Sequence, residues 1–143
     1  MPSKPVPPMN PWSEPYWQAA RAGRLVIPQC RACGRVSFYP RPSCPYCFSD
    51  QLGWVDCSGR GAVYSFTVVI NNAPSAFTAD MPFVIAIVRL EEGVQMLTQV
   101  VDCAPEAVRC DMPVEVTFER LTDEITLPKF KPRRAGQEPV QHA

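Results

Sequence analysis

Four cysteines form two C-x-x-C pairs, Cys30 with Cys33 and Cys44 with Cys47, and ten residues separate the pairs. Two such pairs can hold a tetrahedral metal ion, because each pair binds one side of the ion and the loop brings the pairs face to face. Gly34 follows the first pair, where a small residue lets backbone amides turn toward the sulfurs. The spacing predicts a zinc site, or iron in the same cage. Two disulfides, or free thiols in the core, are the alternative.

The predicted metal is structural rather than catalytic. Four thiolates fill the coordination shell, whereas a catalytic zinc keeps one position for water and usually has histidine or carboxylate ligands. The single histidine, His142, is far from the cysteine pairs in the sequence. A redox role for one pair is disfavoured, because neither pair opens a helix after a strand. We expect metal binding to contribute folding free energy to a small unit.

The composition predicts a cytoplasmic protein of one ordinary domain or two small ones. The chain has 143 residues and no apolar run that approaches membrane-spanning length, and its N-terminus lacks the apolar stretch of a signal peptide. Seven cysteines, with Cys57, Cys103 and Cys110 outside the pairs, fit a reducing compartment. No nearby histidine is available to activate one of these three as a nucleophile, so we expect them to be small buried hydrophobic residues.

Charge is segregated along the chain, although 14 basic and 14 acidic residues give no net charge. Residues 21–60 hold six arginines and two aspartates, residues 80–124 hold ten acidic residues and three arginines, and the C-terminal tail is basic. Both regions can be ordinary solvated surface. Alternatively, the basic regions meet an anion: an acidic patch of a partner, a nucleic acid, or the phosphates of a nucleotide-like cofactor.

A short helix is predicted over residues 12–23, after a proline-rich segment, residues 1–11, that we expect to be extended and mobile. Ser13 is its predicted N-cap and Gly23 its C-terminal stop. Its aromatic residues repeat at helical spacing, so they either pack on this chain or dock on another protein. These residues are Trp12, Tyr16 and Trp17.

The rest of the pattern predicts a mainly β protein. Three strands around the cysteine pairs, at residues 24–29, 36–39 and 52–57, form a zinc ribbon, and a flexible joint at Ser58 to Gly61 follows. Five further strands fit a small Greek-key barrel of the OB type, with a plain β-sandwich as the competing fold. The long loop of residues 71–82 is either a contact surface or an ordinary excursion. The five strands are residues 62–70, 83–90, 94–101, 114–119 and 124–127.

Several blocks occur in an order that resembles a known family. The aromatic helix ends in Ala-Ala-Arg-Ala-Gly-Arg-Leu, and Cys-Arg-Ala-Cys-Gly-Arg and Pro-Arg-Pro-Ser-Cys-Pro-Tyr-Cys follow it. Gly-Arg-Gly-Ala-Val-Tyr-Ser-Phe-Thr-Val-Val, Pro-Phe-Val-Ile-Ala-Ile-Val, Met-Pro-Val-Glu-Val-Thr-Phe-Glu and Leu-Pro-Lys-Phe-Lys-Pro come later. Over about residues 12–132 the chain resembles the zinc-ribbon OB-fold proteins that accompany acyl-CoA enzymes. One departure is Cys110-Asp111, where the family pattern has an apolar residue and glycine.

The resemblance implies a rubredoxin-like zinc ribbon followed by an OB-fold barrel. We divide the chain into a disordered segment (1–11), a helix with the zinc ribbon (12–58), the barrel (59–131) and a basic tail (132–143). The implied function is a non-catalytic accessory subunit of an acyl-CoA-processing complex. It would be inactive alone and required by a thiolase-like, aldolase or hydratase partner, in steroid side-chain or fatty-acid degradation.

The resemblance also assigns candidate residues. Cys30, Cys33, Cys44 and Cys47 carry over as ligands of a structural zinc, and a coenzyme A thioester is the candidate ligand of the complex. Beside the resemblance, basic side chains of the ribbon and the tail are candidates for neutralising its phosphates. These are Arg31, Arg35, Arg41, Lys129 and Lys131, and the docking candidates are Trp12, Tyr16 and Trp17.

Two other function classes are weaker hypotheses. Zinc ribbons and OB barrels also bind single-stranded nucleic acid, with Tyr64 and Phe66 as stacking candidates, but the predicted barrel is the acidic part of the chain. A free-standing enzyme would need an acid–base group. The available carboxylates lie in turns or at strand ends, where a solvated carboxylate is the normal finding. They are Asp80, Glu91, Glu92 and Asp123.

Overall fold

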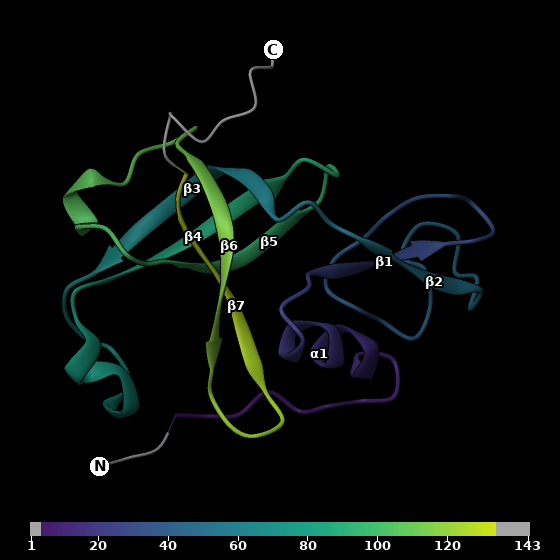
Figure 1. Ribbon diagram of the computed structural model, residues 1–143, viewed down its shortest axis with the longest axis horizontal. Helices are drawn as coiled ribbons and strands as arrows, with labels where there is room; N and C mark the ends of the chain where they lie inside the picture. The colour runs from purple at the N-terminus through teal and green to yellow at the C-terminus, as the bar shows by residue number, and fades with distance from the viewer. Residues whose placement is uncertain (1–3, 134–143) are drawn as a thin grey trace.

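The computed structural model describes residues 4–133. One helix and a small two-stranded sheet lie beside a closed five-stranded barrel (Figure 1). Most of the predicted tail, residues 132–143, lies outside the described residues, and so does His142. Within residues 4–133, no helix is both long and apolar enough to span a bilayer.

Helix α1, Glu14–Arg21, is shorter than the predicted helix. Gly23 does act as the stop, because it adopts φ +82 and its N–H donates to the Ala20 carbonyl. Ser13 occupies the N-cap position but does not cap the helix with its side chain. Its hydroxyl instead accepts a hydrogen bond from the Asn10 N–H and lies 3.3 Å from the Asn10 carbonyl, so it fixes the turn that leads into α1.

The zinc ribbon contains two strands and not the three that were predicted. Strand β1, Val26–Cys30, pairs antiparallel with β2, Leu52–Asp56. The expected middle strand is reduced to one bridge between Gln29 and Val36. Prolines at 40 and 42 interrupt the following segment and have no N–H to donate, so a ladder cannot extend there.

The barrel has the strand order β3-β4-β5-β7-β6, as the OB-fold prediction requires. All its neighbouring strands are antiparallel except β5 and β7, which are parallel and joined at the single pair Val100–Phe130. Because the sheet closes on itself, the β-sandwich alternative is wrong. The loop between β3 and β4 holds a short 3₁₀ helix, and another precedes β6. Strand bounds are β3 Arg60–Val69, β4 Phe83–Leu90, β5 Gln95–Val100, β6 Pro113–Arg120 and β7 Thr126–Pro132, and the 3₁₀ helices are Ser75–Asp80 and Pro105–Ala107.

The departure from the family pattern at Asp111 has a backbone explanation. Asp111 adopts φ +67, the left-handed region that glycine enters without steric cost and that aspartate tolerates better than most residues. Its N–H donates to the Val63 carbonyl at 2.7 Å, and the Val63 N–H donates to the Met112 carbonyl at 3.1 Å. The turn therefore keeps the backbone conformation that glycine would adopt, although the residue is aspartate.

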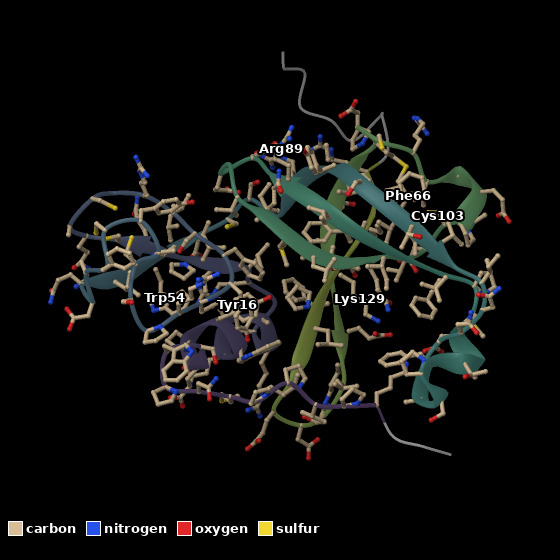
Figure 2. The ribbon with its side chains drawn as sticks, turned by 180° about the vertical axis from the view of Figure 1, so that it is seen from behind. Tyr16, Trp54, Phe66, Arg89, Cys103 and Lys129 are labelled. Carbon is tan, nitrogen blue, oxygen red and sulfur yellow. The ribbon has the colours of Figure 1, made fainter. Side chains whose placement is uncertain are left out.

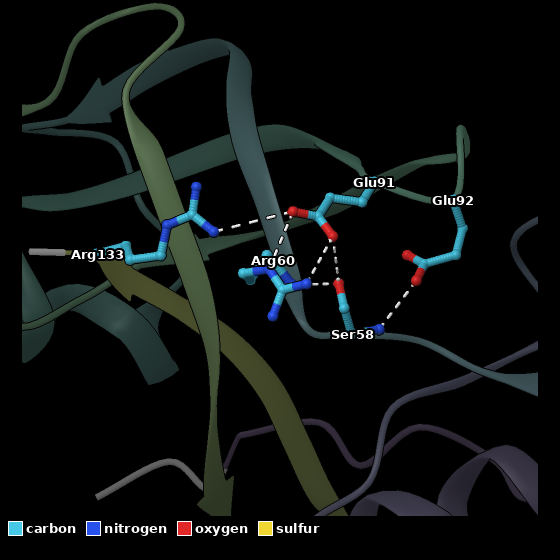
Figure 3. Close-up of polar contacts among 5 residues, drawn as sticks. All are labelled: Ser58, Arg60, Glu91, Glu92 and Arg133. Carbon is cyan, nitrogen blue, oxygen red and sulfur yellow. Dashed lines mark hydrogen bonds and ion pairs between the residues drawn. The ribbon is translucent and has the colours of Figure 1, made fainter. Parts of the chain in front are cut away.

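The segment from Ser58 to Gly61, predicted to be a flexible joint, is held by polar contacts (Figure 3). The Arg60 guanidinium donates two hydrogen bonds to the Glu91 carboxylate, at 2.9 and 3.0 Å. The Ser58 hydroxyl also donates to Glu91, and the Ser58 N–H donates to Glu92. The Arg133 guanidinium lies 3.9 Å from Glu91. The chain thus leaves the ribbon through a clamp between the β4–β5 hairpin, the start of β3 and the end of β7.

One hydrophobic cluster runs through both parts of the molecule. It includes Tyr16 and Trp17 of α1, Ile27 of β1 and Phe130 of β7, which is fully buried. Helix α1 packs on β1, β6 and β7, so it lies between the ribbon and the barrel. The predicted division between residues 58 and 59 stays a prediction, because this core is continuous across it.

Candidate metal centre

The four sulfurs of the cysteine pairs converge at one end of the ribbon. All four Sγ atoms lie within 4.8 Å of one another. The Cys30 and Cys47 sulfurs are 3.6 Å apart, and those of Cys33 and Cys44 are 3.7 Å apart. A tetrahedral zinc with bonds of about 2.3 Å places its sulfurs about 3.8 Å apart, whereas a disulfide bond measures about 2.0 Å. The site fits a structural zinc, and all four cysteines are free thiols rather than disulfides.

Each pair forms a knuckle with the same local geometry. In the first, the Gly34 N–H donates to the Cys30 carbonyl at 2.8 Å, and in the second the Phe48 N–H donates to the Cys44 carbonyl at 2.9 Å. Both residues are left-handed, with φ +80 at Gly34 and φ +65 at Phe48. The first knuckle could be predicted because glycine marks it. The sequence also predicts that a second knuckle starts at Cys44-Pro45, but its left-handed residue could not be recognised, because a phenylalanine holds the position of Gly34.

Backbone amides favour the ionised form of two of the sulfurs. The Cys33 N–H, 3.4 Å from the Cys30 sulfur, is the main cause that lowers the pKa of the Cys30 thiol. At Cys44 burial acts in the opposite direction, but hydrogen bonds from the Cys47 and Tyr46 backbones outweigh it and lower the pKa to about 6. Thiolates are the metal-binding form, so the knuckles prepare these two sulfurs for a cation.

Cys57, outside the cage, is not activated for chemistry. Burial, together with the charges of Glu92 and Asp56, raises the pKa of Cys57 to about 12. Such a thiol is protonated at neutral pH and is a poor nucleophile. Cys57 and Cys103 are partly buried and pack against the hydrophobic cluster. Cys110 is exposed, so the prediction that it is a buried residue is wrong.

The predicted phosphate contacts do not gather at one place. The Arg31 guanidinium lies beside Gly53, where an added Cβ would be 2.9 Å from its Nε. The Arg35 guanidinium stacks on the Tyr46 ring, 4.8 Å from the centroid. Arg41 lines a groove next to α1. All three belong to the ribbon, whereas Lys129 and Lys131 belong to β7 of the barrel.

Lys129 already has a carboxylate partner. Its ammonium forms an ion pair with Glu119 of the neighbouring strand, and its side chain is only 13% exposed. A second anion would have to compete with Glu119 for this charge. Contact of Lys129 and Lys131 with a coenzyme A phosphate therefore stays a prediction.

A groove of about 390 Å³ is lined mainly by residues of β5, β6 and β7. Leu97, Leu121 and Leu127 supply apolar wall, and Lys129, labelled in Figure 2, is another lining residue. Lys4 also lines the groove, and its ammonium pairs with Asp80. The volume is in the range of small-molecule sites, about 300–1,000 Å³, and the wall combines apolar surface with paired charges.

The aromatic residues of the N-terminal segment have different fates. Tyr16 and Trp17 are 3% and 4% exposed, and the Tyr16 ring contacts Trp17, Phe38 and Tyr39 with centroid separations of 4.8 to 5.6 Å. Their assignment as docking residues is corrected, because the core of this chain covers both. Trp12 remains 41% exposed.

Trp12 lines a second groove, of about 180 Å³, with Trp54 and Arg41. Four prolines and the carboxylate of Asp50 contribute to the same groove. Tryptophan and arginine are enriched at protein interfaces, so this groove is the docking candidate that remains from the aromatic helix.

The residues considered for other functions are also placed. Phe66 packs against the core, and the Arg89 guanidinium covers the Tyr64 ring at 4.5 Å, so neither ring is a free stacking platform. The carboxylates considered as acid–base groups have local partners: Asp80 has Lys4, Glu91 has Arg60, Glu92 has the Ser58 amide, and Asp123 has Arg120.

Comparison with known proteins agrees with this two-part architecture. Residues 17–53 match the family model described as the ChsH2 rubredoxin-like zinc ribbon domain, and residues 54–119 match the ChsH2 C-terminal OB-fold domain. A solved structure named Ltp2-ChsH2(DUF35) aldolase superposes with a TM-score of 0.79 at 37% identity. The superposition covers 89% of this chain and 98% of that one.

Two curated relatives are longer proteins. A probable enoyl-CoA hydratase alpha subunit of Thermomonospora curvata is 37% identical over 129 residues, which is 90% of this chain and 40% of the relative. The 3-oxo-4,17-pregnadiene-20-carboxyl-CoA hydratase alpha subunit of Mycobacterium tuberculosis is 42% identical over 82 residues, which is 57% of this chain and 25% of that protein. The sulfur geometry, the barrel topology and these matches show that the chain belongs to the ChsH2 family of zinc-ribbon OB-fold proteins.

Proposed function

We propose that this chain is a non-catalytic accessory subunit of an acyl-CoA-processing complex. The observation that carries the proposal is the match over 98% of a chain from a solved aldolase assembly, with both the ribbon and the barrel retained. The solved chain and this one share the whole two-part architecture, not only the metal site. In this role the zinc is structural, and an aldolase, hydratase or thiolase-like subunit performs the reaction.

The hydratase relatives support the same enzyme class. Both carry names of acyl-CoA hydratase alpha subunits, and one of them acts on a steroid-derived coenzyme A thioester by its name. This chain spans 40% and 25% of their lengths, so we take from them only an association with acyl-CoA enzymes. Steroid side-chain or fatty-acid degradation in the cytoplasm is the proposed setting.

The two grooves give the proposal a physical basis. The groove between β5 and β7 offers apolar wall for part of an acyl-CoA, and the groove lined by Trp12 and Trp54 offers a contact for the partner subunit. We propose that acyl-CoA is bound or handed over at the contact between the subunits, where basic ribbon side chains would face its phosphates.

The test is purification of the affinity-tagged chain from its source organism in mild salt, with mass spectrometry of the proteins that accompany it. We expect an aldolase, hydratase or thiolase-like subunit in fixed stoichiometry. The mixture should turn over a coenzyme A thioester that neither chain alone converts. Repeated recovery of this chain by itself, or turnover of an acyl-CoA by this chain alone, would contradict the proposal.

A further inference from the structure

We propose that the second zinc knuckle, residues 44–48, is a docking loop that inserts Phe48 into an apolar pocket with an acidic rim on the partner enzyme. This inference rests on the proposed function. It adds the surface of the ribbon that meets the partner and the chemistry of the partner's pocket.

The backbone of Phe48 has a conformation that is unfavourable for a bulky side chain. Phe48 adopts φ +65, and the equivalent position of the first knuckle is Gly34 at φ +80. Glycine has no Cβ and enters this region freely, whereas a bulky side chain is strained there. Both residues donate the same hydrogen bond to the first cysteine of their knuckle. The metal loop alone would therefore be built at lower free energy with glycine at position 48.

The described chain leaves the Phe48 ring uncovered. Phe48 is 80% exposed, and Tyr46 in the same knuckle is 52% exposed. Phe48 takes no part in the aromatic contacts of residues 4–133, which gather around Tyr16 and around Phe77. A ring in water forgoes the free energy of burial that it would gain in a pocket. Strain and exposure together are costs that the fold of this chain does not explain.

The second knuckle is a rigid support for Phe48. Cys44 and Cys47 are two of the four sulfurs of the metal cage. The Phe48 N–H is bonded to the Cys44 carbonyl, and the Cys44 N–H is bonded to the Ser49 carbonyl at 2.8 Å. With the metal bound, the loop holds Phe48 in one position before any partner arrives. Such preorganisation lowers the entropy lost on binding.

The charges of the ribbon favour one kind of binding partner. Arg31 and Arg35 of the first knuckle are exposed, and Arg35 stacks on Tyr46 beside Phe48. Arg41 of the loop between the knuckles is also exposed, and Asp50 is the acidic residue that follows the second knuckle. An aromatic anchor on a ribbon whose exposed charges are mostly arginines, with Arg35 on the same knuckle's Tyr46, fits an apolar pocket whose rim carries carboxylates. Because these arginines are exposed, they should act mainly on association rate and salt dependence.

The test compares Phe48→Gly with wild type for binding to the enzyme subunit recovered in the purification described above. Glycine removes the ring and relieves the backbone strain, so zinc content should be unchanged. The unfolding temperature should stay within about 3 °C of wild type or rise. The dissociation constant should increase about tenfold or more, as for loss of a central interface residue. The control is Ile70→Ser, because Ile70 is another apolar residue that is 69% exposed, on the barrel side of the molecule. It should change the dissociation constant by less than about twofold.

Arg35→Glu adds a second readout. It should also weaken binding, and the difference from wild type should shrink as salt is raised. Equal affinity of Phe48→Gly and wild type would overturn the inference and leave the accessory role intact. A wild-type dimer that Phe48→Gly dissociates would show that a second copy occupies the knuckle, which also overturns it. If no enzyme subunit accompanies the wild-type chain in the purification, the proposed function itself fails.

Discussion

At the scale of single residues, the metal centre depends on a few amides. The Cys44 sulfur is buried, which alone would keep its thiol protonated, and the N–H groups of its own knuckle reverse that effect. The exposed Cys33 and Cys47 complete the cage from the solvent side. Each sulfur is therefore required for the ion, while the two buried ones also belong to the packed interior.

Replacement of Cys44 by serine should abolish tight zinc binding. A hydroxyl does not ionise near neutral pH, so the zinc affinity should fall by at least about 100-fold, and the metal-dependent part of the stability should go with it. Metal analysis after dialysis against a chelator, together with thermal unfolding, measures both effects. Cys110→Ser is the matched control, because Cys110 is an exposed thiol outside the cage. Retention of one zinc per chain by Cys44→Ser would show that the cage is not the metal site.

The sequence predicts some residue roles better than others for a physical reason. Metal ligation is set by residue type and short spacing, so the four cysteines could be identified without coordinates. Left-handed backbone is legible only where glycine occupies it, so Gly34 was recognised, whereas Phe48 and Asp111 were not. The burial of Tyr16 and Trp17 depends on what α1 packs against, and the pattern of the helix left that choice open.

At the scale of elements, β3 begins with a close backbone approach. A Cβ on Gly61 would lie 2.5 Å from the Arg89 carbonyl oxygen of β4 and 2.9 Å from a Val88 methyl. Gly61 pairs with Leu90 on β4 and with Val114 on β6, so it stands where β3 joins two neighbours. Glycine at this point lets the barrel close.

Gly61→Ala should destabilise the protein by about 2 kcal/mol, because the methyl group must push apart two hydrogen-bonded strands. Chemical denaturation gives the free energy of unfolding, and hydrogen exchange should show faster opening of the β3–β4 pairs. Ser65→Ala, an exposed position on the same strand, should stay within about 0.5 kcal/mol of wild type. A neutral Gly61→Ala would mean that the two strands have room to separate.

Four of the five barrel strands were predicted to within two residues, because alternating and β-branched runs are local signals. The closing strand was predicted at residues 124–127 but is Thr126–Pro132, because Pro128 and Pro132 interrupt the local strand pattern. The third ribbon strand was predicted wrongly, because pairing requires a partner edge and free N–H groups that a local pattern does not reveal. The helix limits were too wide at both ends for a similar reason. Asn10 holds the Ser13 hydroxyl, and residue 12 lies in the turn before the helix.

At the scale of the whole molecule, the clamp of Figure 3 fixes how the ribbon leaves the barrel. Glu91 receives hydrogen bonds from Arg60 and Ser58, with Arg133 nearby and Glu92 bound to the Ser58 amide. The hydrogen bonds from Arg60 are the main cause that lowers the pKa of the Glu91 carboxyl. The folded state therefore favours the ionised form of Glu91.

The contribution of Glu91 to stability should depend on pH in one direction. Its folded pKa is depressed, so the contribution is fully present above the unfolded value of about 4.3 and is lost as pH falls through the folded value. Wild type should exceed Glu91→Gln in denaturation midpoint at pH 7, by a modest margin for a partly exposed pair, and match it near pH 3. Glu106→Gln, at an exposed acid outside the described ion pairs, is the control. A constant difference across this range would show that charge is not the cause.

The hydrophobic cluster that includes Tyr16 and Trp17 is shared by the ribbon and the barrel. Loss of the metal should therefore affect the stability of the whole polypeptide. A chain made during zinc starvation would lack the free energy that orders the knuckles, and α1 would lose the sheet on one of its sides. The loosened aromatic side chains would then uncover part of the barrel interior to proteases. The abundance of this protein in a cell should accordingly follow the zinc available while it folds.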